Sequence, residues 1–249
     1  MSGLRSQRPA AELRVHEDLD GLFGDCASWF LARLEAAQAA GREPNVGLTG
    51  GSLASDFHAE VVRRAPASTV DFSRVVFWWG DERFVASDDP DRNDLAALTS
   101  LLEPLGVPAS QIHRVPAADE VPDVAAAADA YGTAIRTHGA GEFEVVLFGL
   151  GPDGHVASLF PHHRALDIAD AIAVPVTRAP KPPPERVSLT FEAFERSRAV
   201  AFLVSGEAKA DAVARAWSDG PVSDCPARGV AGQEETVWFT DSLAARSLA

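Results

Sequence analysis

Four short segments of the sequence carry residue types that can act on a small anionic substrate. They are residues 49–52 (TGGS), 80–84 (GDERF), 149–161 (GLGPDGHVASLFP) and 204–213 (VSGEAKADAV). The third segment contains His155, and a neutral imidazole near pH 7 is what a general base needs. We expect the turn Pro-Asp-Gly to present His155 at the start of a short helix, whose positive end would keep the imidazole neutral. Asp153 would then cap that helix or orient the ring.

The same segment also satisfies the glycine pattern G-x-G-x-x-G, which is found in dinucleotide-binding turns. In such proteins the pattern opens a long helix in the first strand–helix unit of the chain. Here it lies beyond residue 148, and Pro161 limits any following helix to about two turns. The pattern therefore favours a site built around His155 over a dinucleotide site. A structural histidine in a turn is the remaining alternative.

Two other segments can hold a phosphate group. In residues 49–52, Gly50 and Gly51 allow close approach of the backbone, and Ser52 opens a helix whose free N–H groups attract anions. Lys209 lies at the start of a later helix, where its charge is unfavourable unless an anion is shared with the helix end. An ordinary tight turn and a surface lysine are the structural alternatives.

The segment GDERF ends a very apolar run with three charges. Arg83 can bind a phosphate or stabilise an oxyanion, and Asp81 can orient a polar group or act as a base. A solvated strand end is the alternative. Neither a G-x-S-x-G motif nor a metal-ligand spacing occurs, so we expect a site for a small phosphorylated molecule without a metal.

The elements around these segments alternate between strands and helices. Helices are expected at 17–40, 52–65, 91–105, 121–138 and 207–217, with a helical C-terminal tail. Residues 45–52 are expected to form a short strand that runs into a glycine turn. Further strands are expected at 74–84, 143–151, 171–176, 186–190, 199–206 and 236–240. This order predicts a single three-layer α/β domain over residues 1–249, with its core at about 15–245 and a mostly parallel, Rossmann-like sheet covered on both faces. Ligands bind such sheets at the carboxyl ends of the strands, where all four segments lie.

The composition excludes several classes of protein. The chain has 249 residues and a net charge of −14, which disfavours binding to nucleic acid or to anionic membranes. Any anionic substrate must therefore be attracted by a local cluster of cations. Two cysteines, no signal-peptide pattern and no long apolar run favour a cytoplasmic protein with reduced thiols.

Taken together, the motifs resemble those of the 6-phosphogluconolactonase family. The similarity covers the four segments above and residues 179–190 (APKPPPERVSLT), in the family's order, over about residues 15–245. It implies a cofactor-free hydrolase of 6-phospho-D-glucono-1,5-lactone in the oxidative pentose phosphate pathway, without nucleic-acid or membrane partners. We expect a monomer or weak oligomer.

The resemblance also implies roles for individual residues. His155 would activate water, Arg83 would hold phosphate or developing charge, and Asp81 and Asp153 would give polar support. The phosphate would be surrounded by Gly50, Gly51, Ser52, Arg186 and Lys209. Residues 53–54 (Leu-Ala) depart from the family's usual Thr-Pro, and residue 93 is Asn after Arg where the family often has Ser-Asn.

Three alternatives remain at this stage. Related glucosamine-6-phosphate isomerases/deaminases share the fold and the phosphate site, although the segments PKPPPER and SLFP favour the lactonase. A sugar-phosphate-binding regulator would need a DNA- or partner-binding segment, and no basic helix-turn-helix pattern is present. A dinucleotide-dependent oxidoreductase would show saturable NAD(P) binding, which we do not expect.

Overall fold

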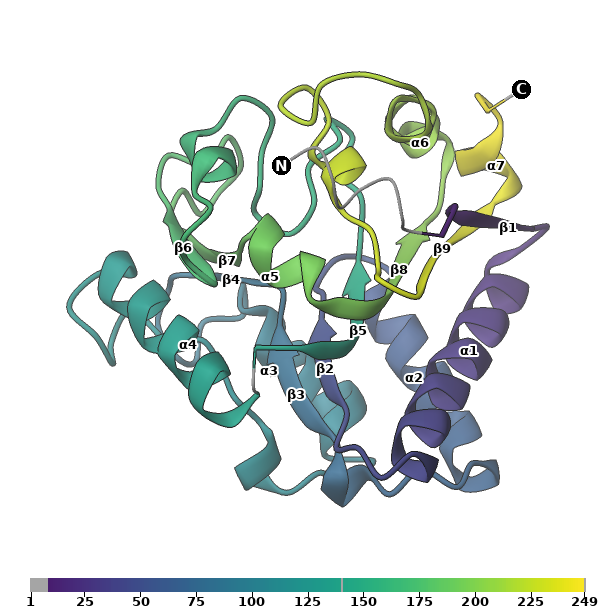
Figure 1. Cartoon of the computed structure of the whole chain (residues 1–249), viewed down its shortest axis with the longest axis horizontal. Coiled ribbons are helices and arrows are strands. Elements are labelled where there is room, and N and C mark those ends of the chain that lie inside the picture. Colours follow the sequence, from purple (N-terminus) through teal and green to yellow (C-terminus); the bar gives the residue numbers. More distant parts are fainter. Residues whose placement is uncertain (1–8, 140, 249) are drawn as a thin grey trace.

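The centre of the fold is a parallel six-stranded sheet with the strand order β1-β9-β8-β5-β2-β3 (Figure 1). The computed structural model describes residues 9–139 and 141–248. The six strands are β1 (Glu12–His16), β2 (Asn45–Leu48), β3 (Val76–Trp79), β5 (Phe143–Phe148), β8 (Ser197–Val204) and β9 (Glu235–Asp241). All neighbouring pairs run parallel. The predicted parallel sheet is thus confirmed, while the edge strand β1 was not expected from the sequence.

A second, antiparallel sheet lies beside the first and has the order β4-β7-β6. Its strands are β4 (Asp81–Arg83), β6 (Ala173–Val176) and β7 (Arg186–Leu189). The prediction of one strand over 74–84 is therefore wrong in one respect, because the strand divides at Gly80. The backbone N–H of Gly80 still bonds Leu48 of the parallel sheet, whereas its carbonyl accepts from Leu189 of the second sheet.

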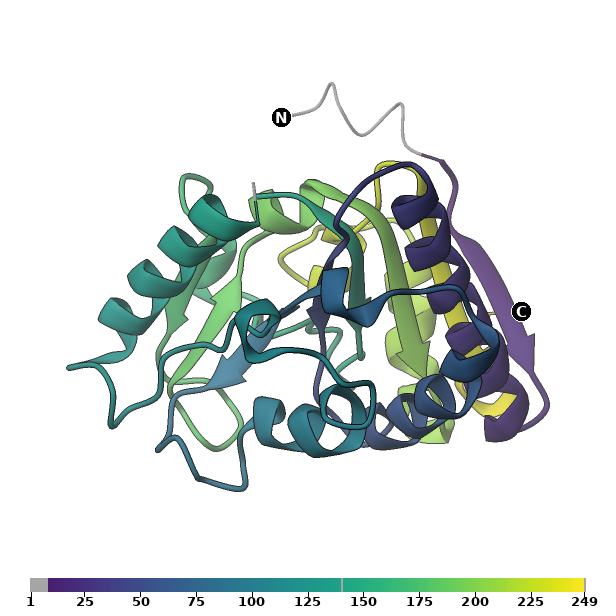
Figure 2. The same cartoon turned by 90° about the horizontal axis from the view of Figure 1, so that it is seen from below.

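Helices cover both faces of the parallel sheet. They are α1 (Leu19–Ala39), α2 (Ala54–Arg64), α3 (Asn93–Ala97), α4 (Val124–His138), α5 (Phe191–Glu195), α6 (Ala210–Trp217) and α7 (Ser242–Ala245). In Figure 2, α1 and α4 lie on opposite sides of the strands. The result is the three-layer, Rossmann-like arrangement expected from the sequence.

The alternation of side chains along each strand divides the core into two clusters. On β5, Val145 and Leu147 pack in a cluster with α1 and α2, whereas Val146 and Phe148 pack in the cluster on the other face. All six residues of β5 are buried. An unbroken apolar run is what a parallel strand needs when both of its faces are covered.

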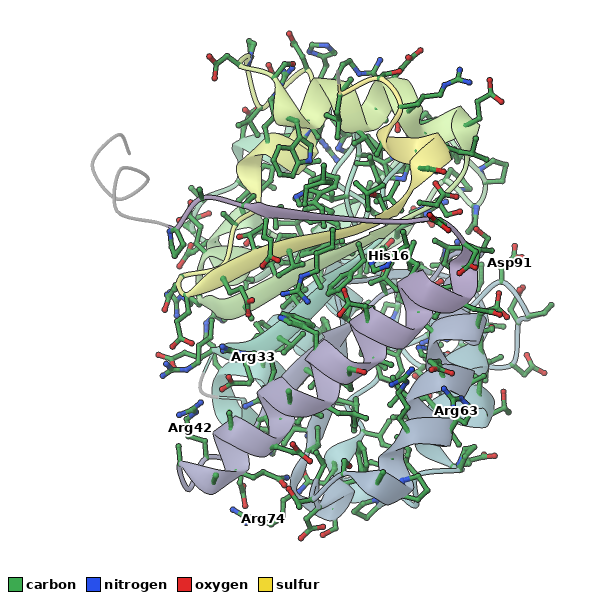
Figure 3. The ribbon with its side chains drawn as sticks, turned by 90° about the vertical axis from the view of Figure 1, so that its right-hand side faces the viewer. His16, Arg33, Arg42, Arg63, Arg74 and Asp91 are labelled. Atoms are coloured by element: carbon green, nitrogen blue, oxygen red, sulfur yellow. The ribbon has the colours of Figure 1, made fainter. Side chains whose placement is uncertain are left out.

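The end of the sheet opposite the glycine-rich strand ends is held by charges. Glu144, near the start of β5, is almost fully buried and pairs with Arg33 at 2.8 Å and with Arg42 at 3.0 Å. In Figure 3, Arg33 and Arg42 lie on the left of the view, whereas Asp91, which lies near the candidate site, is on the right. The network stabilises this end of the fold and takes no part in the site described below.

Several helix boundaries differ from expectation. Helix α1, which was expected over 17–40, begins after the Asp18 cap, and it ends before Gly41, the stop that was predicted. The helix expected over 91–105 is shorter and has two parts. The α-helix α3 comes first, and a π-helical segment at Leu98–Leu102 continues it. In the helix expected over 207–217, residues Glu207–Lys209 form a 3₁₀ turn before α6.

Candidate active site

Two adjoining pockets lie beyond the carboxyl ends of β2, β5 and β8. We call the first the polar pocket; it has a volume of about 570 Å³, including space open to solvent. It is lined by Thr49, Gly50, Gly51, Asp81, Arg83, Asn93, Gly149, Leu150, Gly151, His155, Ala157, Lys181, Arg186 and Lys209. The second, the apolar pocket, shares several of these residues and extends along Leu53, Phe57, Leu147 and Leu203.

His155 and Asp153 form a hydrogen-bonded pair in the loop after β5. The Nδ1 atom of His155 lies against Oδ1 of Asp153 in a very short contact. An imidazole that donates its Nδ1–H to a carboxylate keeps the Nε2 lone pair available to accept a proton. Burial raises the pKa of Asp153, but the hydrogen bonds from the side chain and backbone of His155, together with the charges of His155 and Lys181, lower that pKa overall to about 2. The carboxylate is therefore ionised at neutral pH and orients the ring.

The helix expected to begin at His155 is not present. Residues 151–160 form turns with one isolated bridge between Val156 and Leu159. Ala157 has a φ of +49°, which a right-handed helix cannot accommodate. The prediction that a helix N-terminus controls His155 was therefore wrong. Asp153 orients the ring instead, which was the other role considered for it.

Two glycines of this loop are explained by close contacts. A Cβ atom at Gly151 would lie 1.9 Å from Nδ1 of His155 and 2.5 Å from Oδ1 of Asp153. Gly154 has a φ of +87°, and a Cβ atom there would lie 2.6 Å from Sγ of Cys225. The glycine pattern thus serves the histidine–aspartate pair: one glycine leaves room for the two side chains, and the other allows the turn between them.

Two arginines face each other across the antiparallel sheet. Arg83 of β4 and Arg186 of β7 are register partners, and both line the polar pocket. Like charges at directly opposed positions destabilise a sheet, so this arrangement favours a bound anion between them. Burial and the neighbouring Arg83 lower the pKa of Arg186, while Asp81 acts in the opposite direction.

The two guanidinium groups are held by backbone oxygens. Arg186 is buried and donates to the carbonyls of Pro182 at 3.0 Å and Pro183 at 3.2 Å. Arg83 donates to the carbonyl of Asp91, and its buried Nε has no hydrogen-bond partner among the described residues. Arg83 therefore keeps a donor that none of the described residues uses.

Both lysines of the sequence lie in the polar pocket. Nζ of Lys209 donates to the carbonyl of Leu150 at 2.6 Å, which joins the start of α6 to the His155 loop. Burial, followed by the charge of Lys181, lowers the pKa of Lys209. Lys181 was not among the residues expected from the sequence, although it lies in the PKPPPER segment that was noted there. It adds a fourth cation to the pocket.

Asp81 supports the loop that carries His155. Its buried carboxylate accepts a hydrogen bond of 2.6 Å from Oγ of Ser158 and lies 4.0 Å from Arg186. Because the Asp81 carboxylate is occupied by these contacts, its role is to align Ser158 and Arg186. Ser158, missed by the sequence analysis because an isolated serine gives no signal, also receives a hydrogen bond from Arg186 at 3.5 Å.

The glycine loop after β2 lines both pockets. Gly50 and Gly51 border the polar pocket, while Ser52 lines the apolar one. A Cβ atom at Gly50 would lie 1.9 Å from Oδ1 of Asn93, so that glycine is needed for the close approach of Asn93. Leu53, at the N-cap of α2, makes no side-chain cap, which leaves N–H groups at the helix start.

Comparison with known proteins assigns the chain to a family. Residues 17–238 match the model for glucosamine-6-phosphate isomerases/6-phosphogluconolactonase. The chain belongs to this family. It is 38% identical over 246 residues to the 6-phosphogluconolactonase of Mycobacterium leprae, covering 96% of this chain and 99% of that protein. It is 37% identical to the Streptomyces coelicolor 6-phosphogluconolactonase, covering 95% and 94% of the two chains.

Solved structures of the family have the same fold. The 6-phosphogluconolactonase of Thermotoga maritima matches with a TM-score of 0.82 and 26% identity, covering 93% of this chain and all of the other. A monomeric glucosamine-6-phosphate deaminase matches with a TM-score of 0.81 at 16% identity, covering 95% and 99% of the two chains. The fold is therefore shared by both activities, and the choice between them depends on the sequence and the site.

Two further observations concern the described part of the chain. Within residues 9–139 and 141–248, no helix has the length and apolar character needed to cross a membrane. Those same residues contain no group of three or more His, Cys, Asp and Glu side chains that could hold a metal ion.

Proposed function

We propose that the chain hydrolyses 6-phospho-D-glucono-1,5-lactone to 6-phosphogluconate, the reaction of the oxidative pentose phosphate pathway. The observation that carries this proposal is the oriented His155–Asp153 pair in a pocket whose other wall holds two opposed arginines. A base that can accept a proton lies in one pocket with cations that favour a phosphate. The sequence identity to lactonases of the family supports the same choice.

The phosphate would lie among the glycine loop, Arg186 and Lys209. Backbone N–H groups at Gly50 and Gly51 and the two cationic side chains can donate to its oxygens. This group needs no change during the reaction. Its role is to fix the distance between the lactone carbonyl and His155, so that attack becomes effectively intramolecular.

In the proposed mechanism, Nε2 of His155 takes a proton from water as the water oxygen bonds to C1 of the lactone. The carbonyl electron pair moves to oxygen, and the resulting oxyanion is stabilised by Arg83 or by backbone N–H groups. When the carbonyl re-forms, the bond from C1 to the ring oxygen breaks. The ring oxygen takes the proton back from His155, and the new carboxylic acid ionises and releases one proton to solvent. Asp153 keeps the ring aligned and stabilises the imidazolium in between.

The test follows the release of acid from freshly prepared lactone, against its spontaneous hydrolysis. His155→Asn should lower kcat by about 10²–10⁴-fold, the usual contribution of a positioned base. His162→Asn is a matched control, since His162 is exposed directly after the same segment and Asn tolerates its φ of +57°. Turnover of His155→Asn at the rate of the control would refute the assignment.

Two substrates separate the alternatives. The unphosphorylated lactone should be hydrolysed far less well, because it leaves the cations of the polar pocket without a partner. Release of ammonia from glucosamine 6-phosphate, with no acceleration of lactone hydrolysis, would instead assign the chain to the isomerase/deaminase activity of the same family.

A further inference from the structure

Glu82 is a buried acid that the mechanism above does not use. Its side chain is completely inaccessible to solvent, and it lies between Asp81 and Arg83, which both line the polar pocket. Side chains alternate along a strand, so Glu82 points away from the pocket that its two neighbours face. An acid in such a place needs hydrogen-bond donors to offset the loss of water.

Three backbone N–H groups donate to the Glu82 carboxylate. Oε1 accepts from Arg83 at 2.8 Å and from Asn93 at 2.7 Å, and Oε2 accepts from Asp94 at 2.9 Å. Asn93 and Asp94 are the first two residues of α3, whose first N–H groups have no partner within the helix. Arg92, at the N-cap position, makes no side-chain cap. Glu82 therefore caps α3 from a different part of the chain.

The capped residue Asn93 forms part of the pocket wall. Its Nδ2 donates to the carbonyl of Asp81 at 3.0 Å, and its Oδ1 occupies the space beside Gly50. Asn93 thereby connects the glycine loop after β2 to β4. A shift of the first turn of α3 would change the positions of both segments at the pocket.

A contribution to folding stability does not explain why an acid occupies this position. Burial, and then the neighbouring Asp94 carboxylate, raise the pKa of Glu82 to about 7, against the lowering effects of the Asn93 and Arg83 N–H groups and of Arg92. An acid whose pKa is raised in the folded state loses stabilising effect as the pH rises through that value. At neutral pH and above, the charged side chain costs stability, so its value lies in the geometry that it sets.

We propose that Glu82 is a positioning residue of the polar pocket. It holds Arg83 and Asn93 in place from the face of β4 that points away from the pocket, without touching the substrate. This inference rests on the proposed function, because the lactone reaction is proposed to take place in the pocket whose residues Glu82 positions. It goes beyond that function by assigning a role to a residue outside the pocket.

The first test compares two variants that each replace a buried acid by an amide. In Glu82→Gln the amide nitrogen cannot accept, so at least one of the three N–H groups loses its partner. Glu144→Gln makes the same change at the opposite end of the sheet. Glu82→Gln should lower kcat/KM by about 10–100-fold under conditions in which both variants remain folded, since small misplacements at a site have effects of that size. Equal activity of the two variants would overturn the proposal.

A double-mutant cycle with Asn93→Ala tests whether Glu82 acts through Asn93. If it does, the double variant should lose much less activity than the product of the two single losses. Independent, multiplicative losses would contradict the proposal. If Glu82→Gln does not fold, Glu82→Asp replaces it: this side chain keeps the charge but is too short to reach all three N–H groups. Loss of activity then supports positioning, and wild-type activity refutes it.

A binding measurement keeps the two proposals separate. If the wild-type protein does not hydrolyse the lactone, the proposed function fails, and calorimetric titration with inorganic phosphate decides the role of Glu82. At least tenfold weaker binding in Glu82→Gln than in Glu144→Gln would support positioning of the pocket. Equal affinities would overturn it.

Discussion

Replacing Gly151 by alanine should displace His155 and Asp153 from their positions in the polar pocket. The added Cβ would lie 1.9 Å from Nδ1 and 2.2 Å from Cε1 of His155, and 2.5 Å from Oδ1 of Asp153. Atoms in normal contact lie about 3.5 Å apart, so the ring must move by roughly 1.5 Å. The backbone cannot easily move instead, because Gly151 also bonds His155 and Gly154 through its N–H and carbonyl groups.

The size of the expected effect follows from this displacement. A misplacement of about 1 Å can cost about 10²-fold in rate, and complete loss of a general base costs about 10²–10⁴-fold. We therefore expect kcat to fall by about 100- to 1,000-fold in Gly151→Ala, or about 3–4 kcal/mol in the barrier. KM should change less than kcat, since Arg186 and the glycine loop at Gly50 and Gly51 lie on other segments.

The assay is acid release from fresh lactone at saturating substrate, with circular dichroism to confirm folding. Gly80→Ala is the control, because a Cβ atom there meets only the carbonyl of Leu48, at an ordinary 3.5 Å. If Gly151→Ala is folded and keeps kcat within threefold of Gly80→Ala, the reasoning that places the pair at the centre of catalysis is wrong.

Three further predictions follow from other contacts. Lys209→Met should raise KM by about 10–100-fold with a smaller effect on kcat, as steady-state kinetics would show, because one charged donor to the phosphate is lost; an unchanged KM would exclude Lys209 from binding. Gly154→Ala should have a free energy of unfolding about 1–3 kcal/mol lower than that of Gly41→Ala, because both glycines have positive φ but only an added Cβ at Gly154 meets Cys225. It should therefore unfold at a lower denaturant concentration, and equal midpoints would refute this. Burial lowers the pKa of His58 to about 4, so the stability that depends on its neutral form is present above pH 6.5 and is lost as the pH falls toward 4. Urea titrations should show a loss of about 2 kcal/mol from this group between pH 7.5 and pH 5, absent in His58→Gln.

The sequence predicted those parts of the fold that depend on local patterns. Unbroken apolar runs ending in glycine marked strands such as β2, β5 and β8, and their carboxyl ends do form the pocket walls. His155 and Asp153 were found in the same way, because a turn sequence and a charged residue are visible within a few positions. The error at His155 arose because turn propensity does not reveal whether a helix follows.

Other features depend on partners distant in the sequence. The second sheet pairs β4 with β7, about 100 residues away, and nothing local to residues 81–83 specifies that partner. The place of Asn93 at the pocket likewise follows from contacts with Glu82 and Gly50, which lie on other segments of the chain. Lys181 lies in the segment PKPPPER, but nothing in that segment indicates which way its side chain points.

The division of one apolar run at Gly80 also determines how the chain tolerates changes in length. Trp79 belongs to the parallel sheet, and Asp81 begins the antiparallel one, so a single residue connects the two. An insertion there would shift β4 by one position against β7, and a shift of one residue reverses the faces of a strand. Glu82 would enter the pocket, while Asp81 and Arg83 would turn toward the protein interior. Insertions at this junction should therefore be far less tolerated than those in the exposed turn around Gly41.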